Sequence, residues 1–150
     1  MEENKTTDLI RNIAVGFDRA IETRDIEAAV AYFADDCLIE VLGLELDGKD
    51  GARKWMNWLL ERLAEIKIEL GDSALNGNTL FEEYTLKAKG RDGTRLNSRQ
   101  TEVITVQDGK IKSLRIYFDR FDFADLVARG FLAKTILQEI TRVSLRGLED

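Results

Sequence analysis

Carboxyl side chains are the strongest candidates for chemistry in this sequence, because most other common catalytic groups are missing. Histidine is absent, and cysteine occurs once, at Cys37. A Ser-His or Cys-His nucleophile, a histidine-based zinc site and a thiolate cluster are therefore excluded. The glycine spacings match neither a phosphate-binding loop nor a dinucleotide fingerprint. Catalysis would have to use carboxylates, Tyr, Lys, Arg, Asn, Gln or water, and we expect neither a metal nor a cofactor.

Two neighbouring predicted strands bring polar side chains together. Successive residues of a strand face opposite sides, so Gln100 and Glu102 share one face, and Glu83 and Thr85 share one face of the adjoining strand. In an enclosed apolar space, desolvation would raise the pKa of each carboxyl group, by up to about 3–5 units on full burial. One carboxyl could then be protonated while the other is ionised, as a general acid and base. The alternative is that both glutamates face solvent.

Three helices are predicted ahead of these strands. Apolar residues recur at helical spacing over 10–21, and Asp25 is placed to cap a short second helix. A strand then covers about 37–46. The third helix carries Trp55 on its apolar stripe, with Trp58 beside it.

From about residue 67 the apolar period changes from 3.6 to 2, which predicts an antiparallel meander. The connections contain Asn-Gly and Asp-Gly, which tolerate the positive φ that tight hairpins need. A helical tail over about 122–146, interrupted at Gly130, follows the meander. Helices followed by a meander predict an α+β fold, in one domain spanning 1–150. The predicted strands of the meander cover 67–75, 79–89, 94–106 and 110–118.

Composition limits the partners. Apolar residues make up 44% and charged residues 33% of the 150 residues, with a net charge of −6. The negative charge argues against nucleic acid and against an anionic membrane surface. No apolar run approaches the roughly 20 residues that span a bilayer. The polar start, Met1 to Lys5, is unlike a signal peptide, and Cys37 has no partner for an internal disulfide, so we expect a cytoplasmic protein.

Two segments carry a resemblance to a known superfamily. The stretch Ala31 to Glu40 reads as a helix end that breaks into a strand, and Thr101 to Ile111 reads as a hairpin turned at Asp108-Gly109. Together they resemble the nuclear transport factor 2-like superfamily, which includes ketosteroid isomerase, limonene epoxide hydrolase and SnoaL-like polyketide cyclases. The resemblance implies a cone, in which three N-terminal helices pack on a strongly curved antiparallel or mixed sheet around an apolar pocket.

The same resemblance sets the phase of the first strand. Counting without gaps from the helix end places Ile39 and Val41 inward and Glu40 outward. A slip of one residue would turn Glu40 inward, where the isomerase has its base aspartate. Phe17 stands at the position of the isomerase's oxyanion-hole tyrosine, and Ile116 at the position of a catalytic aspartate in the hydrolase and the cyclases. These known mechanisms therefore do not transfer.

Glu102 matches the relatives differently. At its position the cyclases carry an active-site histidine and the isomerase its second active-site aspartate. Glu83 and Thr85 fall where the hydrolase has a catalytic Arg and Asp. We therefore expect Glu102 as acid or base with Glu83 as its partner, and Glu40 as a weaker catalytic candidate. The expected ligand-binding residues are Phe17, Tyr32, Ile39, Val41, Trp55, Trp58, Thr85, Gln100, Ile116, Phe118 and Phe123.

The expected function is binding of a small hydrophobic molecule, with cofactor-free proton transfer of the isomerase, cyclase or hydrolase type. The alternatives are a non-catalytic small-molecule-binding or dimeric scaffold protein, and an adaptor that grips a protein partner with the outer sheet. Apolar residues assigned to that outer face, among them Tyr84, Leu86 and Val103, favour a homodimer.

Overall fold

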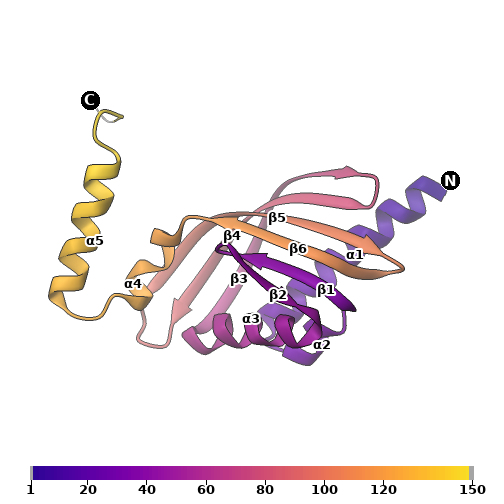
Figure 1. Ribbon diagram of the computed structural model, residues 1–150, viewed down its shortest axis with the longest axis horizontal. Helices are drawn as coiled ribbons and strands as arrows, with labels where there is room; N and C mark the ends of the chain where they lie inside the picture. Colours follow the sequence, from indigo (N-terminus) through magenta and orange to yellow (C-terminus); the bar gives the residue numbers. More distant parts are fainter. Residues whose placement is uncertain (1, 149–150) are drawn as a thin grey trace.

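The computed structural model describes residues 2–148, which form one mixed sheet with helices before, within and after it (Figure 1). Their order confirms the α+β class. The helices are α1 (Glu2–Glu22), α2 (Ile26–Val30), α3 (Gly48–Arg62), the short 3-10 helix η1 (Arg120–Phe123), α4 (Ala124–Val127) and α5 (Phe131–Ser144). The strands are β1 (Phe33–Val41), β2 (Leu44–Asp47), β3 (Leu63–Asn76), β4 (Thr79–Gly90), β5 (Arg95–Gln107) and β6 (Lys110–Phe118).

The sheet has the strand order β2-β1-β6-β5-β4-β3. Only β1 and β6 run parallel among the paired strands of residues 2–148, and the other four pairs are antiparallel. The sheet is not strongly curled, so the prediction of strong curvature is wrong. Sharp bending of a sheet depends on bulges, and the central pair β4–β5 keeps one unbroken register from Thr79↔Thr105 to Lys89↔Arg95.

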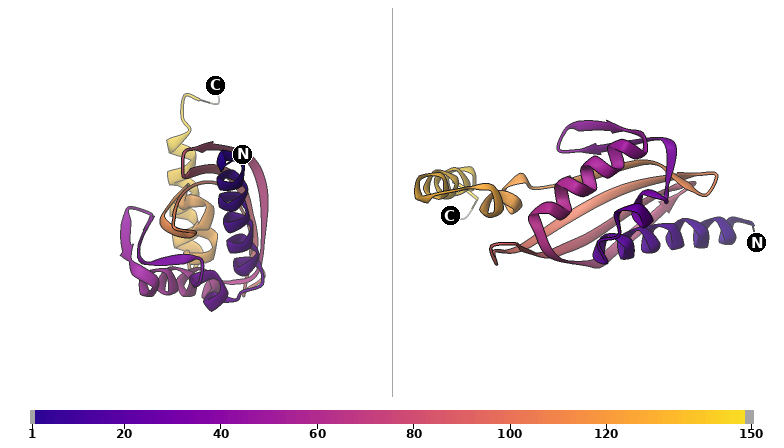
Figure 2. Two further views of the ribbon diagram at one scale, coloured as in Figure 1. Left: turned by 90° about the vertical axis from the view of Figure 1, so that its right-hand side faces the viewer. Right: turned by 90° about the horizontal axis from the view of Figure 1, so that it is seen from below.

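The helices cover one face of the sheet, which we call the inner face (Figure 2). α1 contacts β3, and α3 contacts β1, β2 and β3. The core between them is apolar, and Phe17 lies at its centre, with its ring 5.3 Å from that of Phe33 and 6.2 Å from that of Trp55. This packing fixes α1 and α3, and with them the side chains that the two helices direct at the sheet.

The predicted strand over 37–46 is a hairpin of two strands instead. Leu42 and Gly43 both have positive φ, 55° and 77°, and form the two-residue turn between β1 and β2. Gly43 suits a turn, but a leucine at positive φ is uncommon, so the pair Leu42-Gly43 is an unusual hairpin turn. The chain therefore forms a hairpin within the range predicted as one strand, and α3 begins at Gly48, directly after β2.

The tail after β6 is helical and broken at Gly130 (φ 86°), as predicted. η1 and α4 lie against the sheet, whereas α5 stands away from the body of the protein (Figure 1). Phe131 is 87% exposed, and Ile136 is 52% exposed. Within residues 2–148, no helix is both long enough and apolar enough to cross a membrane.

The phase predicted for β4 is wrong by one residue. Leu80, Glu82, Tyr84 and Leu86 are buried, whereas Phe81 and Glu83 are exposed on the outer face. Leu80, Tyr84 and Leu86 share a face with Glu82, so apolar alternation favours the observed phase. The error came from the resemblance, which places Glu83 and Thr85 at catalytic positions of the hydrolase. The apolar outer face therefore does not include Tyr84 or Leu86.

Gly51 sets how closely α3 approaches the β1–β2 hairpin. A Cβ atom at this position would lie 2.8 Å from the backbone carbonyl carbon of Leu46. We expect Gly51→Ala to lower the free energy of unfolding by about 1–3 kcal/mol, the usual cost of overpacking, although the same change in an open helix is stabilising. Urea denaturation measures this. Asn57→Ala, on the exposed side of α3, is the control and should be neutral or stabilising; equal behaviour of both variants would contradict the packing argument.

Candidate functional site

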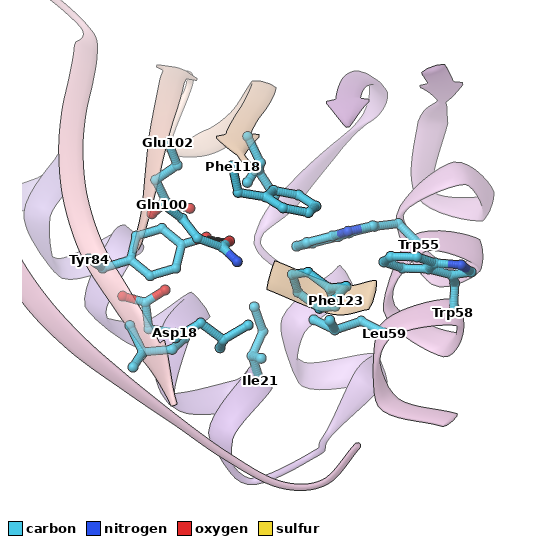
Figure 3. A pocket seen from close by; sticks show the side chains of 13 residues that line it. Asp18, Ile21, Trp55, Trp58, Leu59, Tyr84, Gln100, Glu102, Phe118 and Phe123 are labelled. Atoms are coloured by element: carbon cyan, nitrogen blue, oxygen red, sulfur yellow. Dashed lines mark hydrogen bonds between the residues drawn. The ribbon is translucent and has the colours of Figure 1, made fainter. Parts of the chain in front are cut away.

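A small cavity lies between α1, α3 and the inner face of the sheet, and η1 closes it (Figure 3). Its volume is about 30 Å³, whereas pockets that hold whole ligands usually measure about 300–1,000 Å³. As closed here, the cavity therefore has room for little more than a water-sized group. The walls of the cavity are already in place, and a molecule larger than water could enter only if one of these walls moved.

The cavity has two chemically different walls (Figure 3). One wall is polar and consists of Asp18 from α1, Tyr84 from β4, and Gln100 and Glu102 from β5. The other wall is aromatic, with Trp55 and Trp58 from α3, Phe118 from β6 and Phe123 from η1. Phe123 packs against both neighbours, with ring centres 5.0 Å from Phe118 and 6.4 Å from Trp58. A bound molecule would thus meet acids on one side and aromatic rings on the other.

Three carboxyl groups meet behind the polar wall. Glu82 and Glu102 are direct cross-strand partners, and Asp18 reaches them from α1, so that one oxygen from each lies within 4.8 Å of the others. Asp18 is 8%, Glu82 7% and Glu102 3% exposed. Like charges opposite one another on a sheet are destabilising, and burial makes each ionised form costly.

The pKa values of these groups are raised accordingly. Burial raises the pKa of Asp18 to about 8, with added repulsion from Glu82 and Glu22. Burial also raises the pKa of Glu102 well above its ordinary value, and the charges of Asp18 and Glu82 add to this. The pKa of Glu82 is raised by burial and partly restored by Arg11. At neutral pH the cluster therefore holds protons that exposed carboxyls would have lost.

Two carboxyl oxygens of the cluster have no hydrogen-bond partner among residues 2–148. They are Oδ2 of Asp18 and Oε1 of Glu102. Buried polar atoms are nearly always paired, so these two are exceptions that call for an explanation. Both residues line the cavity, where a bound molecule or a water could supply the missing partner.

A chain of hydrogen bonds leads from the polar wall to the cavity's closing segment. The Tyr84 hydroxyl donates to Oε1 of Gln100 at 2.8 Å, and Nε2 of Gln100 donates to the Ser98 hydroxyl at 3.1 Å. The Ser98 hydroxyl in turn donates to Oδ2 of Asp122 at 2.6 Å. Asp122 immediately precedes Phe123, so this chain holds η1, and with it Phe123, over the cavity.

Seven of the residues predicted for the site line the cavity. Glu102 lines it from the inner face of β5, as the predicted strand phase required. The others that line it are Trp55, Trp58, Gln100, Ile116, Phe118 and Phe123.

The remaining predicted residues lie elsewhere. Phe17, Ile39 and Val41 are buried in the core but do not line the cavity. Tyr32 is half-buried near Gly16, at the far side of α1. Glu40 alternates with the buried Ile39 and Val41 and therefore faces away from the core.

Glu83 and Thr85 need correction, because the one-residue error in β4 placed them inside. Both lie on the outer face, where the Glu83 carboxylate approaches the Arg99 guanidinium at 3.5 Å. Glu83 is therefore not the partner of Glu102. That place is taken by Asp18 and Glu82.

Asp18 was missed, although the sequence contains a signal for it. It lies four residues after Ala14 and three before Ile21, so helical spacing puts it on the apolar stripe of α1. A carboxyl group on a buried stripe is uncommon. Carboxylate oxygens also suit hard cations, so the cluster can chemically either share protons or accept a positive charge.

The raised pKa of Asp18 predicts how stability depends on pH. Between pH of about 4 and about 8, folded Asp18 keeps a proton that the unfolded chain has lost, so the free energy of unfolding falls as the pH rises through this range. The stabilisation is fully present below the unfolded pKa and is lost once the pH passes the folded one. Asp18→Asn removes this dependence, by an amount on the order of a few kcal/mol across the range.

Urea denaturation at pH 5, 7 and 9 measures this for the wild type and Asp18→Asn. Glu83→Gln, which removes an exposed carboxylate from the same sheet, is the control and should follow the wild-type curve. Parallel curves for the wild type and Asp18→Asn would contradict the raised pKa.

Comparisons with known proteins agree with this architecture. A ketosteroid isomerase-like protein from Catenulispora acidiphila, solved with trimethylamine, superposes with a TM-score of 0.70 at 13% identity, covering 81% of this chain and 95% of that one. An LEH-like epoxide hydrolase from M. tuberculosis gives 0.68 at 23% identity, covering 88% and 98%. A putative polyketide cyclase from Sinorhizobium meliloti gives 0.61 at 21% identity, covering 71% and 94%.

These likenesses establish a shared fold, whose members include epoxide hydrolases, cyclases and proteins of unknown function. No curated protein matches the sequence. The family comparison is more specific, because the SnoaL-like domain matches residues 14–114, from α1 through most of β6. That match spans well over half of the chain and includes the carboxyl cluster, and the chain therefore belongs to the SnoaL-like domain family.

Proposed function

We propose that this protein binds a small, largely apolar molecule in the cavity and catalyses cofactor-free proton transfer on it. The observation that carries this proposal is the pair of unpartnered, buried carboxyl oxygens on Asp18 and Glu102, two residues that line a mostly apolar cavity. Strongly perturbed carboxyls in a cavity are a feature of acid–base sites. The fold relatives include proteins solved with trimethylamine and with polyporic acid.

The roles of the two carboxyls follow from their surroundings. Glu102 is the more deeply buried, and burial raises its pKa well above the ordinary value, so its protonated form donates a hydrogen bond to an oxygen on which negative charge develops. Asp18, with a pKa of about 8, is ionised in part of the population at neutral pH and takes a proton from carbon next to that oxygen's carbonyl. Returning the same proton to another carbon completes an isomerisation without any net oxidant or water.

Gln100 is placed to orient the bound molecule. Its amide is held by the Tyr84 hydroxyl and by Ser98 on the polar wall, and a fixed group orients a ligand better than a mobile one. An epoxide hydrolysis of the limonene type is disfavoured, since among residues 2–148 no arginine lines the cavity. Water activated by the carboxyl pair would be a hydrolytic variant of the same chemistry.

Entry of a ligand requires η1 to move, because the closed cavity of about 30 Å³ cannot hold a molecule of ordinary substrate size. Phe123 is the side chain that η1 contributes to the closure. Binding without catalysis is the alternative function. Phe17 and Ile116, apolar residues at positions where the resemblance implies catalytic groups, favour it.

Replacing Glu102 separates the two functions. We expect Glu102→Gln to lower turnover of a cyclic enone, polyketide or epoxide substrate by about 10²–10⁴-fold, because an amide, unlike a carboxylic acid, cannot pass a proton to the oxygen on which negative charge develops. Steady-state kinetics on a panel of such compounds measures this, and Glu83→Gln on the outer face is the control. Turnover unchanged in Glu102→Gln would refute the catalytic role, while ligand-induced thermal stabilisation without any turnover would support binding alone.

We also propose that two copies pair through the outer face of the sheet. Phe81 is 40% and Tyr117 49% exposed there. Val103, the cross-strand partner of Phe81, is itself buried and faces Arg115 on β6. Phe81 and Tyr117 are the exposed apolar groups through which we expect this pairing.

We expect light scattering to give the mass of a dimer for the wild type and of a monomer for Phe81→Glu, because the new charge would be buried in the interface. Asn57→Glu adds the same charge on the exposed side of α3, away from the outer face of the sheet, and should leave the dimer intact. A monomeric wild type would contradict the pairing.

A further inference from the structure

We propose that the ligand of this cavity carries a protonated amine, held by Asp18 and Glu102, with its apolar body against the aromatic wall. This deepens the proposed function and rests on it, since it takes the same cavity to be a binding site and names the chemical class of the ligand.

The first argument is the charge balance of the cavity. Within residues 2–148, the side chains that line it include Asp18 and Glu102 but no lysine or arginine, and the sequence contains no histidine. The oxygens that lack a partner, Oδ2 of Asp18 and Oε1 of Glu102, belong to residues that are 8% and 3% exposed. An alkylammonium group has up to three N–H donors and a positive charge, so it can satisfy both oxygens at once.

The nearby charged groups described here do not neutralise Asp18 and Glu102. On α1, Glu22 adds repulsion to Asp18, and its own carboxylate accepts from the backbone N–H of Ile68 on β3 at 2.7 Å. Arg11, also on α1, is the cation that acts on Glu82, and its guanidinium donates to the Ser73 hydroxyl at 2.8 Å. Arg11 therefore offsets one of the three carboxyls, and a cation from the ligand would offset the pair that faces the cavity.

The second argument is the aromatic wall opposite. Aromatic faces attract cations, and the attraction is stronger where water is excluded. Trp58 already contacts one cation in this way, because the Arg62 guanidinium lies 4.8 Å from the centre of its ring. Trp55, Phe118 and Phe123 stand across the cavity from Asp18 and Glu102 (Figure 3), so methyl or methylene groups next to the nitrogen would pack on them.

Other occupants fit the two walls less well. A molecule without an N–H or O–H donor leaves both unpartnered oxygens unsatisfied, and an anion would add to the negative charge of Asp18 and Glu102. The hard cations Mg²⁺ and Ca²⁺ take six or more oxygen ligands, and the wall opposite the carboxyls is aromatic and offers none. The separation of acids from rings matches a molecule with one cationic end and one apolar end.

The test compares tert-butylammonium with tert-butanol, which share one carbon frame and differ in the charged group. We expect isothermal titration calorimetry at pH 7 to show the ammonium compound binding at least about tenfold more tightly. Asp18→Asn and Glu102→Gln should each weaken the ammonium compound about tenfold or more, and leave the alcohol little changed. Glu83→Gln, which removes a carboxylate of the outer face, should change neither affinity.

A second measurement needs no variant and covers the case in which one fails to fold. Titration of the wild type with the ammonium compound, in two buffers of different ionisation enthalpy, should show protons released on binding, because the cation displaces protons from the carboxyl pair. The alcohol should release none. Absence of proton release together with equal affinities would overturn the amine assignment.

The remaining outcomes keep the two proposals distinguishable. Tighter binding of tert-butanol would overturn the amine inference and leave the proposed binding of an apolar molecule in place. Binding of neither compound, or of any other in the enone, polyketide and epoxide panel, would overturn both. Stabilisation by MgCl₂, CaCl₂ or MnCl₂ that requires Asp18 and Glu102 and competes with the ammonium compound would show a metal site instead, and would also overturn the inference.

Discussion

The burial of three carboxyl groups between α1 and the inner face of the sheet is the constraint around which the rest of the structure is arranged. Glu82 and Glu102 are paired across β4 and β5, and Asp18 lies over them from α1. Three ionised groups at this spacing would repel one another strongly in a medium of low dielectric, so the folded state keeps them partly protonated. The fold thus maintains a local reservoir of protons beside an apolar cavity, without histidine and without a lysine or arginine in the cavity wall of the described chain.

Hydrogen bonds connect the polar wall of the cavity with η1, the segment that closes it. Tyr84, Gln100 and Ser98 form a continuous hydrogen-bonded row on the inner face, and the row ends on Asp122. Because Asp122 and Phe123 are adjacent, any movement that withdraws Phe123 from the aromatic wall also breaks the bond between Ser98 and Asp122. Opening therefore has a polar cost as well as an apolar one, and a ligand must replace both kinds of contact to hold the site open.

The sequence predicted the fold class, and it predicted the aromatic wall of the cavity better than the polar wall. Trp55, Trp58 and Phe118 lie where apolar periodicity placed them, and Glu102 lies on the inner face of β5, as the predicted phase of that strand required. The β4 face was predicted wrongly, because the resemblance places Glu83 and Thr85 at catalytic positions of the hydrolase, although Leu80, Tyr84 and Leu86 share a face with Glu82. Asp18 was not predicted, because the candidate carboxyl groups all lay on predicted strands and Asp18 lies on α1. The closing role of η1 depends on the contacts of Asp122 and Phe123, which no local pattern encodes.

Fold likeness alone does not supply the chemistry of this protein. The resemblance implies catalytic groups at the positions of Phe17 and Ile116, where this chain has apolar side chains, so the likeness by itself predicts no mechanism. Instead, this chain buries three carboxyl groups together, which lowers its stability. Apolar residues at positions 18, 82 and 102 would fill the same space without desolvating any charge. A cost confined to one cavity, where two of the carboxyls lack partners, is the pattern expected when a site gives up stability for function. The function of this chain is therefore to be sought in what satisfies those oxygens, and only secondarily in the likeness of its fold.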